Sequence, residues 1–320
     1  MKAIYYNQHG DPDVLEYGEL PTPNIEPHQV LVQVAATSVN PIDRRLRGGE
    51  LQEYITRTFP VVPGWDVAGR IVAVGSGVSG WKVGDDVIGL AFTWSIQHGS
   101  YAEFLPIDAN AITAKPASLS FCDAAALPLT SLTAWQSLSE FADLRPGQSV
   151  LIQAGAGGLG SVSIPIAKYL GAKVYTTARE ENFDYLRSLG ADHMIDYSKT
   201  DYEAALRALE PDGVDVVLES LLGNGTAEAA IRLAKSGGCV AYMNNEPPDI
   251  PDINERDIKA EFIHHRPDGV MLKALVDLFA VSKLTIPHIK KMPLHLAAEA
   301  HRLSETGRTR GKIVLEIQDM

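Results

Sequence analysis

The stretch from Ser149 to Gly160, read as SVLIQAGAGGLG, constrains the fold of this chain more than any other part of it. It begins with a short apolar run typical of a buried parallel strand, and glycines follow where such a strand turns into a helix. In that geometry Gly155 makes the tight turn, Gly157 lets backbone approach a phosphate, and Gly160 lets the helix pack on its strand. We therefore predict a pyrophosphate site with amides at the helix start, formed by Gly155, Gly157, Gly158, Leu159 and Gly160. A glycine-rich surface loop is the alternative.

Strand-like and helix-like segments alternate from this stretch onward, which predicts a doubly wound parallel sheet. They are Val150–Gln153, Gly158–Leu170, Lys173–Ala178, Asn182–Leu189, Val214–Leu218 and Cys239–Tyr242. Pro165 is expected to kink the first of these helices.

The part of the chain before residue 123 is expected to be rich in strands, with Pro and Gly clusters between them. The predicted strands are Lys2–Tyr6, Val30–Ala36, Ala68–Val74 and Asp86–Leu90, and together they indicate a small barrel-like domain. Cys122–Leu144 is expected to be helical with Asp123 as its N-cap. The terminal run Gly311–Ile317 reads as a strand that pairs back into this first domain.

Composition excludes several classes of function. The formal net charge of −12 over 320 residues opposes binding of nucleic acid. The two cysteines, Cys122 and Cys239, exclude a disulfide framework and a thiolate zinc cluster. We read no secretory signal and no apolar run of membrane-spanning length, so we expect a cytoplasmic location in a reducing compartment.

Seven motifs in a fixed order make the chain resemble a known family. They are VLVQVAATSVNPID (30–43), PGWDVAGRIVAVG (63–75), VGDDVIG (83–89), GSYAEF (99–104), LPLTSLTAW (127–135), AGAGGLG (154–160) and RGKIVLEI (310–317). They resemble the medium-chain dehydrogenase/reductase superfamily, in its zinc-independent quinone oxidoreductase branch. The resemblance implies an α/β fold with a split, GroES-like, β-rich catalytic domain (1–123 and 258–320) and an inserted Rossmann nucleotide-binding domain (124–257). It also implies a homodimer.

The residues argue against a metal site. Where zinc-dependent relatives carry a cysteine and a histidine ligand, this chain has Asn40 and Trp65. Neither side chain replaces a thiolate or imidazole on zinc. The nine histidines are scattered, and the one adjacent pair, His264 and His265, would point to opposite faces of a strand. We therefore expect no metal.

The cofactor is expected to be NADPH (NADP). A fold that prefers NAD places an acidic residue about 20 residues beyond the glycines, where it bonds the ribose 2′-hydroxyl. Here that place holds Arg179, whose guanidinium suits a 2′-phosphate. A solvent-exposed charge at a strand end is the alternative, which Glu180 and Glu181 keep open. Tyr197 is a second candidate for the 2′-phosphate.

The resemblance assigns further cofactor contacts to Arg45, Thr133, Met243, Asn244, Phe262 and His264. Around the substrate we expect Asn40 to donate a hydrogen bond to the developing oxyanion, Asp43 to orient Asn40 or its loop, and Tyr54 to line the pocket or pass a proton through water. Trp65 offers a flat surface to a planar substrate. Each has a structural alternative: a turn residue for Asn40, an N-cap for Asp43, and a core aromatic for Trp65.

These features predict hydride transfer from NADPH to a small-molecule quinone or α,β-unsaturated carbonyl. An enoyl-thioester reductase is the first alternative, with Arg44, Arg45 and Arg47 available for the phosphates of an acyl carrier. A non-catalytic NADPH-binding sensor or regulatory protein is the second.

Overall fold

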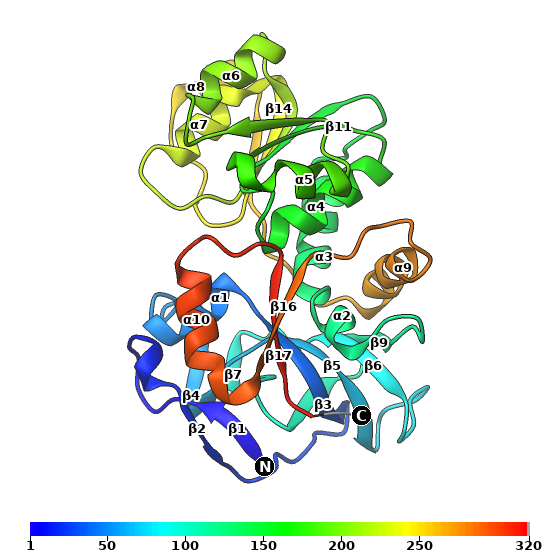
Figure 1. Ribbon diagram of the computed structural model, residues 1–320. Coiled ribbons are helices and arrows are strands. Elements are labelled where there is room, and N and C mark those ends of the chain that lie inside the picture. The colour runs from blue at the N-terminus through cyan, green and yellow to red at the C-terminus, as the bar shows by residue number, and fades with distance from the viewer. Residues whose placement is uncertain (319–320) are drawn as a thin grey trace. The chain divides into compact units, whose positions relative to one another are not determined.

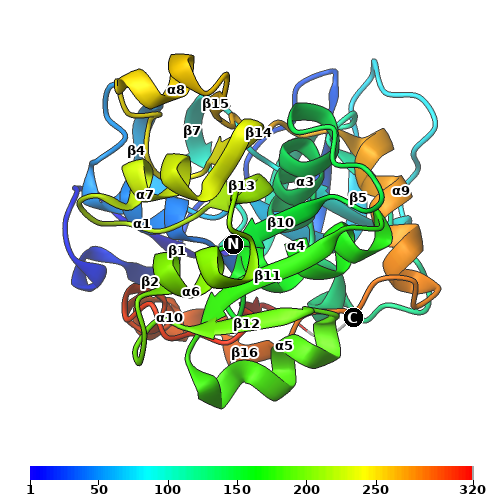
Figure 2. The ribbon, with the colours of Figure 1, turned by 90° about the horizontal axis from the view of Figure 1, so that it is seen from above.

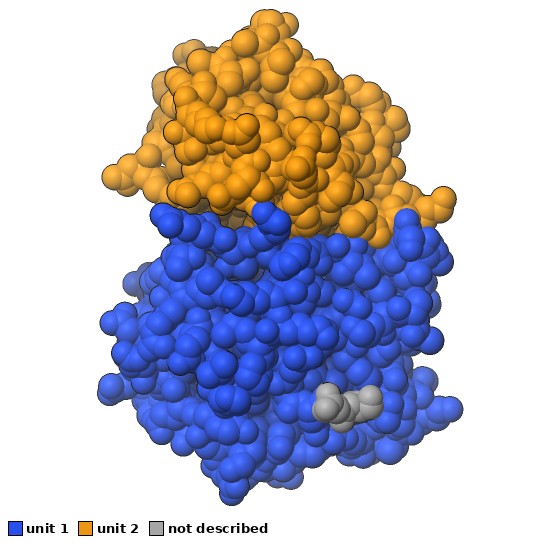
Figure 3. All heavy atoms as spheres, in the orientation of Figure 1, with its two compact units in different colours: residues 1–132, 266–282, 286–320 blue, residues 133–265, 283–285 orange. Residues whose placement is uncertain are grey.

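A computed structural model of the protein describes residues 1–318, so positions 319 and 320 of the predicted split domain lie outside it. The chain divides into two compact units, coloured in Figure 3. The first contains residues 1–132, 266–282 and 286 to the end of the described chain. The second contains residues 133–265 and 283–285. Each unit has its own hydrophobic core.

The first unit is built on an antiparallel sheet whose central strand is β3 (Figure 1). Its strands follow the order β16-β17-β3-β5-β6-β9, and β8 also pairs with β3. They are β3 (Gln29–Val39), β5 (Asp66–Val74), β6 (Asp86–Leu90), β8 (Phe104–Asp108), β9 (Ile112–Ala114), β16 (Ile289–Pro293) and β17 (Lys312–Glu316). β17 pairs antiparallel with β3, which confirms that the terminal strand returns to the first domain. Only the β16–β17 pair in this sheet is parallel among the described residues.

Two short strand pairs and four helices complete this unit. β1 (Lys2–Tyr5) pairs antiparallel with β2 (Glu16–Glu19), and β4 (Thr56–Val62) pairs in parallel with β7 (Ser95–His98). The helices are α1 (Pro41–Gly48), α2 (Phe121–Ala125), α9 (Gly269–Ala280) and α10 (Ala297–Glu305). Alternating apolar residues of β3, such as Val30, Val32 and Val34, are fully buried against β5, β6 and β8. This alternation places one face of the sheet in the core.

The second unit is a parallel sheet of six strands in the order β12-β11-β10-β13-β14-β15. The strands are β10 (Ser149–Ile152), β11 (Lys173–Ala178), β12 (His193–Asp196), β13 (Val214–Glu219), β14 (Ala234–Tyr242) and β15 (Lys259–Phe262). Numbered within the unit, the order is 3-2-1-4-5-6, that of a doubly wound dinucleotide-binding sheet. The predicted Rossmann architecture is therefore confirmed.

Helices cover this sheet as the alternation predicted (Figures 1 and 2). α4 (Gly158–Tyr169) packs with α5 (Phe183–Leu189) and against β10 and β11. α6 (Tyr202–Leu209) packs with α7 (Thr226–Leu233), and α7 packs against β13, β14 and α8 (Pro251–Glu255). α4 runs continuously through Pro165, which is buried inside it. Among the described residues, no helix combines the length and apolar content that crossing a membrane requires.

Two details of the prediction differ from the structure at residues 120–141. The N-cap of α2 is Ser120, whose Oγ accepts a hydrogen bond from Asp123 N at 3.1 Å, while Asp123 Oδ2 accepts one from Ser120 N. Asp123 is thus the third helical residue of a capping box and not the N-cap. The predicted single helix is divided, because Pro128 begins a new helix, α3 (Pro128–Trp135), and a π-helical turn follows at 136–141.

The domain boundaries that we predicted, after residues 123 and 257, differ from those of the compact units, which fall after 132 and 265. At the first, α2 packs on β3 and β5 and so belongs to the first unit. At the second, β15 pairs in parallel with β14, which extends the second unit's sheet beyond residue 257.

Candidate functional site

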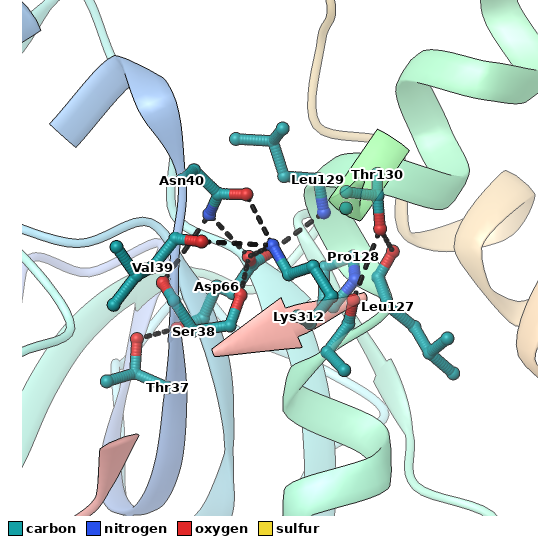
Figure 4. Close-up of polar contacts among 12 residues, drawn as sticks. Thr37, Ser38, Val39, Asn40, Asp66, Leu127, Pro128, Leu129, Thr130 and Lys312 are labelled. Carbon is teal, nitrogen blue, oxygen red and sulfur yellow. Dashed lines mark hydrogen bonds and ion pairs between the residues drawn. The ribbon is translucent and has the colours of Figure 1, made fainter. Parts of the chain in front are cut away.

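A buried polar cluster lies where three neighbouring strands of the first unit meet (Figure 4). Asn40 follows the end of β3, Asp66 begins β5 and Lys312 begins β17. β3 lies between the other two strands in the sheet, so their ends come together. All three side chains are at most 2% exposed. Ionisable groups are rarely this buried unless they are paired.

Each charge in this cluster is paired. Lys312 Nζ donates to Asn40 Oδ1 at 2.5 Å and to the Val39 carbonyl at 3.3 Å, and it lies 3.7 Å from Asp66 Oδ2. Asp66 Oδ2 accepts from Asn40 Nδ2 and Ser38 Oγ at 2.7 and 2.5 Å. Asp66 Oδ1 accepts from Leu129 N, in the first turn of α3, at 2.7 Å. Burial lowers the pKa of Lys312, while Asp66 and Asp43 act in the opposite direction.

Asn40 is held on both sides of its amide. Its Oδ1 accepts from Lys312, and its Nδ2 donates to Asp66 and weakly to the Ser38 carbonyl at 3.4 Å. The hydrogen bond that we predicted from Asn40 to a substrate oxygen would have to replace one of the two that Nδ2 donates, to Asp66 or to the Ser38 carbonyl. The amide therefore lies between an ammonium and a carboxylate and positions both.

Asp43 lies on the first turn of α1, and its Oδ2 accepts from Asn40 N at 2.8 Å and from Tyr101 Oη at 3.1 Å. Asn40 is the N-cap of α1, and Asp43 is the third helical residue, whose carboxylate bonds the Asn40 backbone in a capping box. Burial raises the pKa of Asp43 to about 7, which the hydrogen bond from Asn40 opposes. Its Oδ1 is buried without a hydrogen-bond partner.

Tyr54 and Trp65, the other two predicted substrate residues, lie in very different surroundings. Tyr54 is 65% exposed at the end of the turn that precedes β4. Trp65 is fully buried and packs against Phe92, with ring centroids 5.0 Å apart. Its ring is covered in this structure, as expected of a core aromatic, and would have to be uncovered to receive a substrate.

The arginines of α1 have partners within the first unit. Arg44 and Arg45 both form ion pairs with Glu50, at 3.2 and 3.4 Å. Arg47 is 3% exposed and donates to the Gly10 carbonyl, His301 and Glu305. The suggestion that Arg47 helps to bind the phosphates of an acyl carrier is therefore wrong, because its guanidinium is enclosed.

The predicted cofactor residues of the second unit lie at one edge of its sheet. The glycines follow β10, Arg179 follows β11, Tyr197 follows β12, and Met243 follows β14. Asn244 comes next after Met243, Phe262 ends β15, and His264 lies two residues beyond it. Since these strands are parallel neighbours, their carboxyl ends form a single edge.

The glycines of the turn after β10 differ in how closely the chain packs around them. A Cβ on Gly155 would lie 2.0 Å from Thr176 Oγ1, and one on Gly160 would lie 2.5 Å from Gly155 Cα. By contrast, a Cβ on Gly157 would approach only the Ala154 carbonyl oxygen, at 3.2 Å. The first two glycines permit close packing of strand, turn and helix. Gly157 is the N-cap of α4, and its N–H donates to the Ala154 carbonyl at 2.9 Å.

Polar atoms without partners lie along the same unit. Thr133 Oγ1 and Arg179 Nε are both buried and lack a hydrogen-bond partner. Buried polar atoms are usually satisfied, so these are places where a polar ligand fits. Together with the glycine turn, they fit a nicotinamide dinucleotide, which carries phosphates, ribose hydroxyls and a carboxamide.

Sequence reasoning missed Asp66 and Lys312, although both lie inside quoted motifs. A signal was present, because each is a charged residue at the start of an apolar strand, in WDVAG and GKIVLEI. Their pairing was not visible, because Lys312 is separated from Asn40 by 272 positions. Gln153 and Glu219, discussed below, were missed for the same reason.

Comparison with known proteins is consistent with both units. A family model described as alcohol dehydrogenase GroES-like domain matches residues 26–117, and one described as zinc-binding dehydrogenase matches residues 189–315. Within residues 1–318, no group of three or more His, Cys, Asp or Glu residues is arranged to hold a metal ion.

Two curated relatives match nearly the whole chain. The 2-methylene-furan-3-one reductase of Solanum lycopersicum is 36% identical over 98% of this chain and 79% of its own length. The NADPH-dependent alkenal/one oxidoreductase, chloroplastic, of Arabidopsis thaliana is 33% identical over the same shares.

Solved structures with the same fold include two quinone oxidoreductases. That of Coxiella burnetii is 34% identical, with a TM-score of 0.89 over 99% of both chains. That of Escherichia coli, complexed with NADPH, is 25% identical, with a TM-score of 0.89 over 99% of this chain and 100% of the other. The protein is accordingly an oxidoreductase. It belongs to the medium-chain dehydrogenase/reductase superfamily and, within it, to the zinc-independent quinone oxidoreductase branch.

Proposed function

We propose that this protein reduces a quinone or an α,β-unsaturated carbonyl compound with NADPH. The observation that carries the proposal is the carboxyl edge of the second unit's sheet. Along it lie Tyr197, Arg179, the glycine turn and Met243, in the order of their strands. A dinucleotide laid along this edge has its adenosine end near Arg179 and its nicotinamide end beyond the switch in strand order. The names of the Solanum and Arabidopsis relatives support an enone acceptor, and those of the bacterial structures support a quinone.

The preference for NADPH is supported by Arg179. Its Nε is buried and unpartnered at the end of β11, where an acidic residue would select NAD. A guanidinium forms paired hydrogen bonds with a phosphate, and it has no comparable interaction with the 2′-hydroxyl of NADH. Glu180, the next residue, is paired with Lys199 and so does not neutralise Arg179.

When bound, the cofactor supplies a hydride, which the acceptor takes together with one proton. A quinone becomes a hydroquinone, and an enone becomes a saturated carbonyl compound. The protein's part is to hold the dinucleotide and to balance the charge that develops on oxygen. In the first unit, the Asn40–Asp66–Lys312 cluster fixes the start of α1 and carries an ammonium close to Asn40. Asn40 and Asp43 stay our candidates for contact with the acceptor or its surroundings, and Tyr54 for lining the pocket.

The test is an acceptor screen with small quinones, enones and enoyl thioesters, each with NADPH and NADH, before and after treatment with a chelator. We expect turnover with NADPH on quinones or enones and no effect of the chelator. Replacing Arg179 by Ala should raise the KM for NADPH by about tenfold, the loss of one charge-assisted pair, and leave the KM for NADH unchanged. Arg187→Ala, which removes an exposed arginine of α5, is the matched control.

Other results would contradict particular parts of the proposal. Equal KM values for NADPH and NADH would contradict the proposed preference for NADPH. Loss of activity on chelation would contradict a mechanism without a metal. Preferred turnover of enoyl thioesters would indicate the enoyl-thioester reductase. Tight NADPH binding without turnover of any acceptor would indicate a sensor.

A further inference from the structure

Two polar side chains end the strands at which the order of the second sheet reverses. Gln153 follows β10, and Glu219 ends β13. These two strands are adjacent at the centre of the sheet, with β11 and β12 beyond β10 and with β14 and β15 beyond β13. In the parallel register Ile152 lies opposite Leu218. The next positions, Gln153 and Glu219, are therefore neighbours on the same face. Ligands of doubly wound sheets bind in the crevice outside the strand ends at this switch point.

Both side chains are fully buried and incompletely bonded. Gln153 Oε1, Gln153 Nε2 and Glu219 Oε2 have no hydrogen-bond partner. The other oxygen, Glu219 Oε1, accepts from Leu221 N at 3.2 Å and from Asn245 Nδ2 at 3.1 Å. The carboxylate thus has one bonded and one open oxygen, and neither polar atom of the amide is bonded, so both side chains can take a further polar partner.

Glu219 also connects the two loops that leave β13 and β14. Its carbonyl accepts from Met243 N at 3.0 Å, and its carboxylate accepts from Asn245 in the same loop. Asn244 Nδ2 donates to the Ser220 carbonyl at 2.7 Å. The loop that carries Met243 and Asn244, our candidates for the nicotinamide end of the cofactor, is thus held by Glu219 and its neighbour.

Glu219 can change its charge near neutral pH. Burial raises its pKa to about 7, while the hydrogen bonds from Asn245 and Leu221 and the nearby Thr226 hydroxyl act in the opposite direction. The titratable groups that face it are Tyr242 on β14 and Tyr202 on α6, whose pKa values it helps to raise. Glu228 on α7 also acts on Tyr242, and Arg232 on the same helix acts on Tyr202.

We propose that Gln153 and Glu219 set the relative affinity of the protein for oxidised and reduced nicotinamide dinucleotide. The oxidised ring carries a positive charge and the reduced ring does not, so ionised Glu219 at the switch point favours the oxidised form. Protonated Glu219, which takes its proton from solvent, removes this preference. The inference rests on the proposed function, because it requires the dinucleotide to lie along this edge of the sheet.

The test is titration of the protein with NADP⁺ and with NADPH by calorimetry, from about pH 6 to about pH 8.5. The quantity compared is the ratio of the two dissociation constants, Kd(NADPH)/Kd(NADP⁺). The 2′-phosphate, which titrates near pH 6, is common to both ligands and cancels in the ratio. Titration with NAD⁺ and NADH, which lack that phosphate, gives the same comparison.

In the wild-type protein the ratio should rise with pH by roughly three- to tenfold, with a midpoint near pH 7, the pKa of Glu219. In Glu219→Gln it should stay at its low-pH value throughout. Asp212→Asn removes an exposed carboxylate before the other end of β13 and should behave like the wild type. Gln153→Leu replaces the amide beside Glu219 by an apolar group and should shift the midpoint to higher pH.

A wild-type ratio that does not change with pH, or an unchanged slope in Glu219→Gln, would overturn the inference although both dinucleotides bind. If Glu219→Gln does not fold, as judged by circular dichroism, the Gln153→Leu midpoint decides, and an unmoved midpoint overturns the inference. Failure of all four dinucleotides to bind would instead contradict the proposed function.

Discussion

At the scale of single residues, the charges in the core of the first unit are paired with one another. Asp66 has an ammonium, an amide, a hydroxyl and a backbone amide around its carboxylate, and Lys312 has two oxygens besides Asp66. Buried pairs of this kind add little net stability compared with apolar residues, but breaking one is costly because it leaves the other charge alone. The cluster is therefore sensitive to loss of either partner.

Replacing Lys312 by Met should lower the free energy of unfolding by about 3–5 kcal/mol, because Asp66 stays buried without its ion partner. Denaturant unfolding of the purified protein measures it. Lys291→Met on the neighbouring β16 removes a lysine whose side chain is 52% exposed, and it should cost less than about 1 kcal/mol. The double variant Asp66→Asn, Lys312→Met should recover part of the loss. If the two lysine variants lower the free energy of unfolding equally, breaking the buried Asp66–Lys312 pair is no more destabilising than losing an exposed lysine.

At the scale of elements, the glycines in the turn between β10 and α4 have two different roles, one in packing and one in the approach of a ligand. Gly155 and Gly160 are required for packing, since a Cβ at either would collide with Thr176 Oγ1 or with backbone. Gly157 has an ordinary φ of −76°, and a Cβ there would meet only the Ala154 carbonyl oxygen, at 3.2 Å, so we expect its lack of a side chain to matter less to packing than to a ligand. The same motif therefore serves the fold and the site through different residues.

Gly160→Ala should lower the melting temperature by several degrees, because its Cβ would lie 2.5 Å from Gly155 Cα. Gly157→Ala should lower the melting temperature less than Gly160→Ala does, because its Cβ would meet one backbone oxygen at 3.2 Å. It should weaken NADPH binding by about tenfold or more, because a methyl group would stand where the pyrophosphate approaches. Thermal unfolding and calorimetric titration distinguish the two effects. Normal NADPH affinity in Gly157→Ala would contradict the assignment of this turn.

At the scale of the whole molecule, each unit has a buried acid whose pKa lies near neutral pH, Asp43 in the first unit and Glu219 in the second. Burial raises the pKa of Asp43 and of Glu219 to about 7, from 3.8 and 4.5 respectively. Above their ordinary values, the folded protein binds more protons at these sites than the unfolded chain does, so each site destabilises the fold as pH rises. His301 acts in the opposite sense, since burial lowers its pKa to about 3.

The stability of the wild type relative to Asp43→Asn should therefore fall as pH rises from about 4 to about 7, by at most about 1.4 kcal/mol per pH unit. Glu219→Gln should show the same relation from about 4.5 to about 7. Urea unfolding at several pH values measures both, and the difference between variant and wild type cancels the contribution of His301. A constant difference across this range would mean that folding does not raise the pKa of the acid.

Much of the fold was predictable because it depends on local patterns. The β10–α4 turn, the alternation that follows it and the position of Arg179 all come from spacing along the chain, and the structure places Arg179 at the end of β11 as counted. The helix around Asp123 was predicted less well. Its N-cap at Ser120 depends on a local capping box, and its division depends on the new helix that begins at Pro128. The Ala- and Leu-rich composition of the segment indicates neither.

The sequence by itself determined the class of fold, the parallel sheet with its glycine turn, and the family, because strand and helix periods and glycine spacing are properties of neighbouring residues. Only the tertiary structure decided which polar residues face each other in the interior. Lys312 bonds Asn40 across 272 positions because β17 pairs with β3, and Gln153 and Glu219 occupy adjacent positions because β10 pairs with β13. The physical reason is that burial and electrostatic pairing depend on which strands become neighbours, which no local pattern specifies.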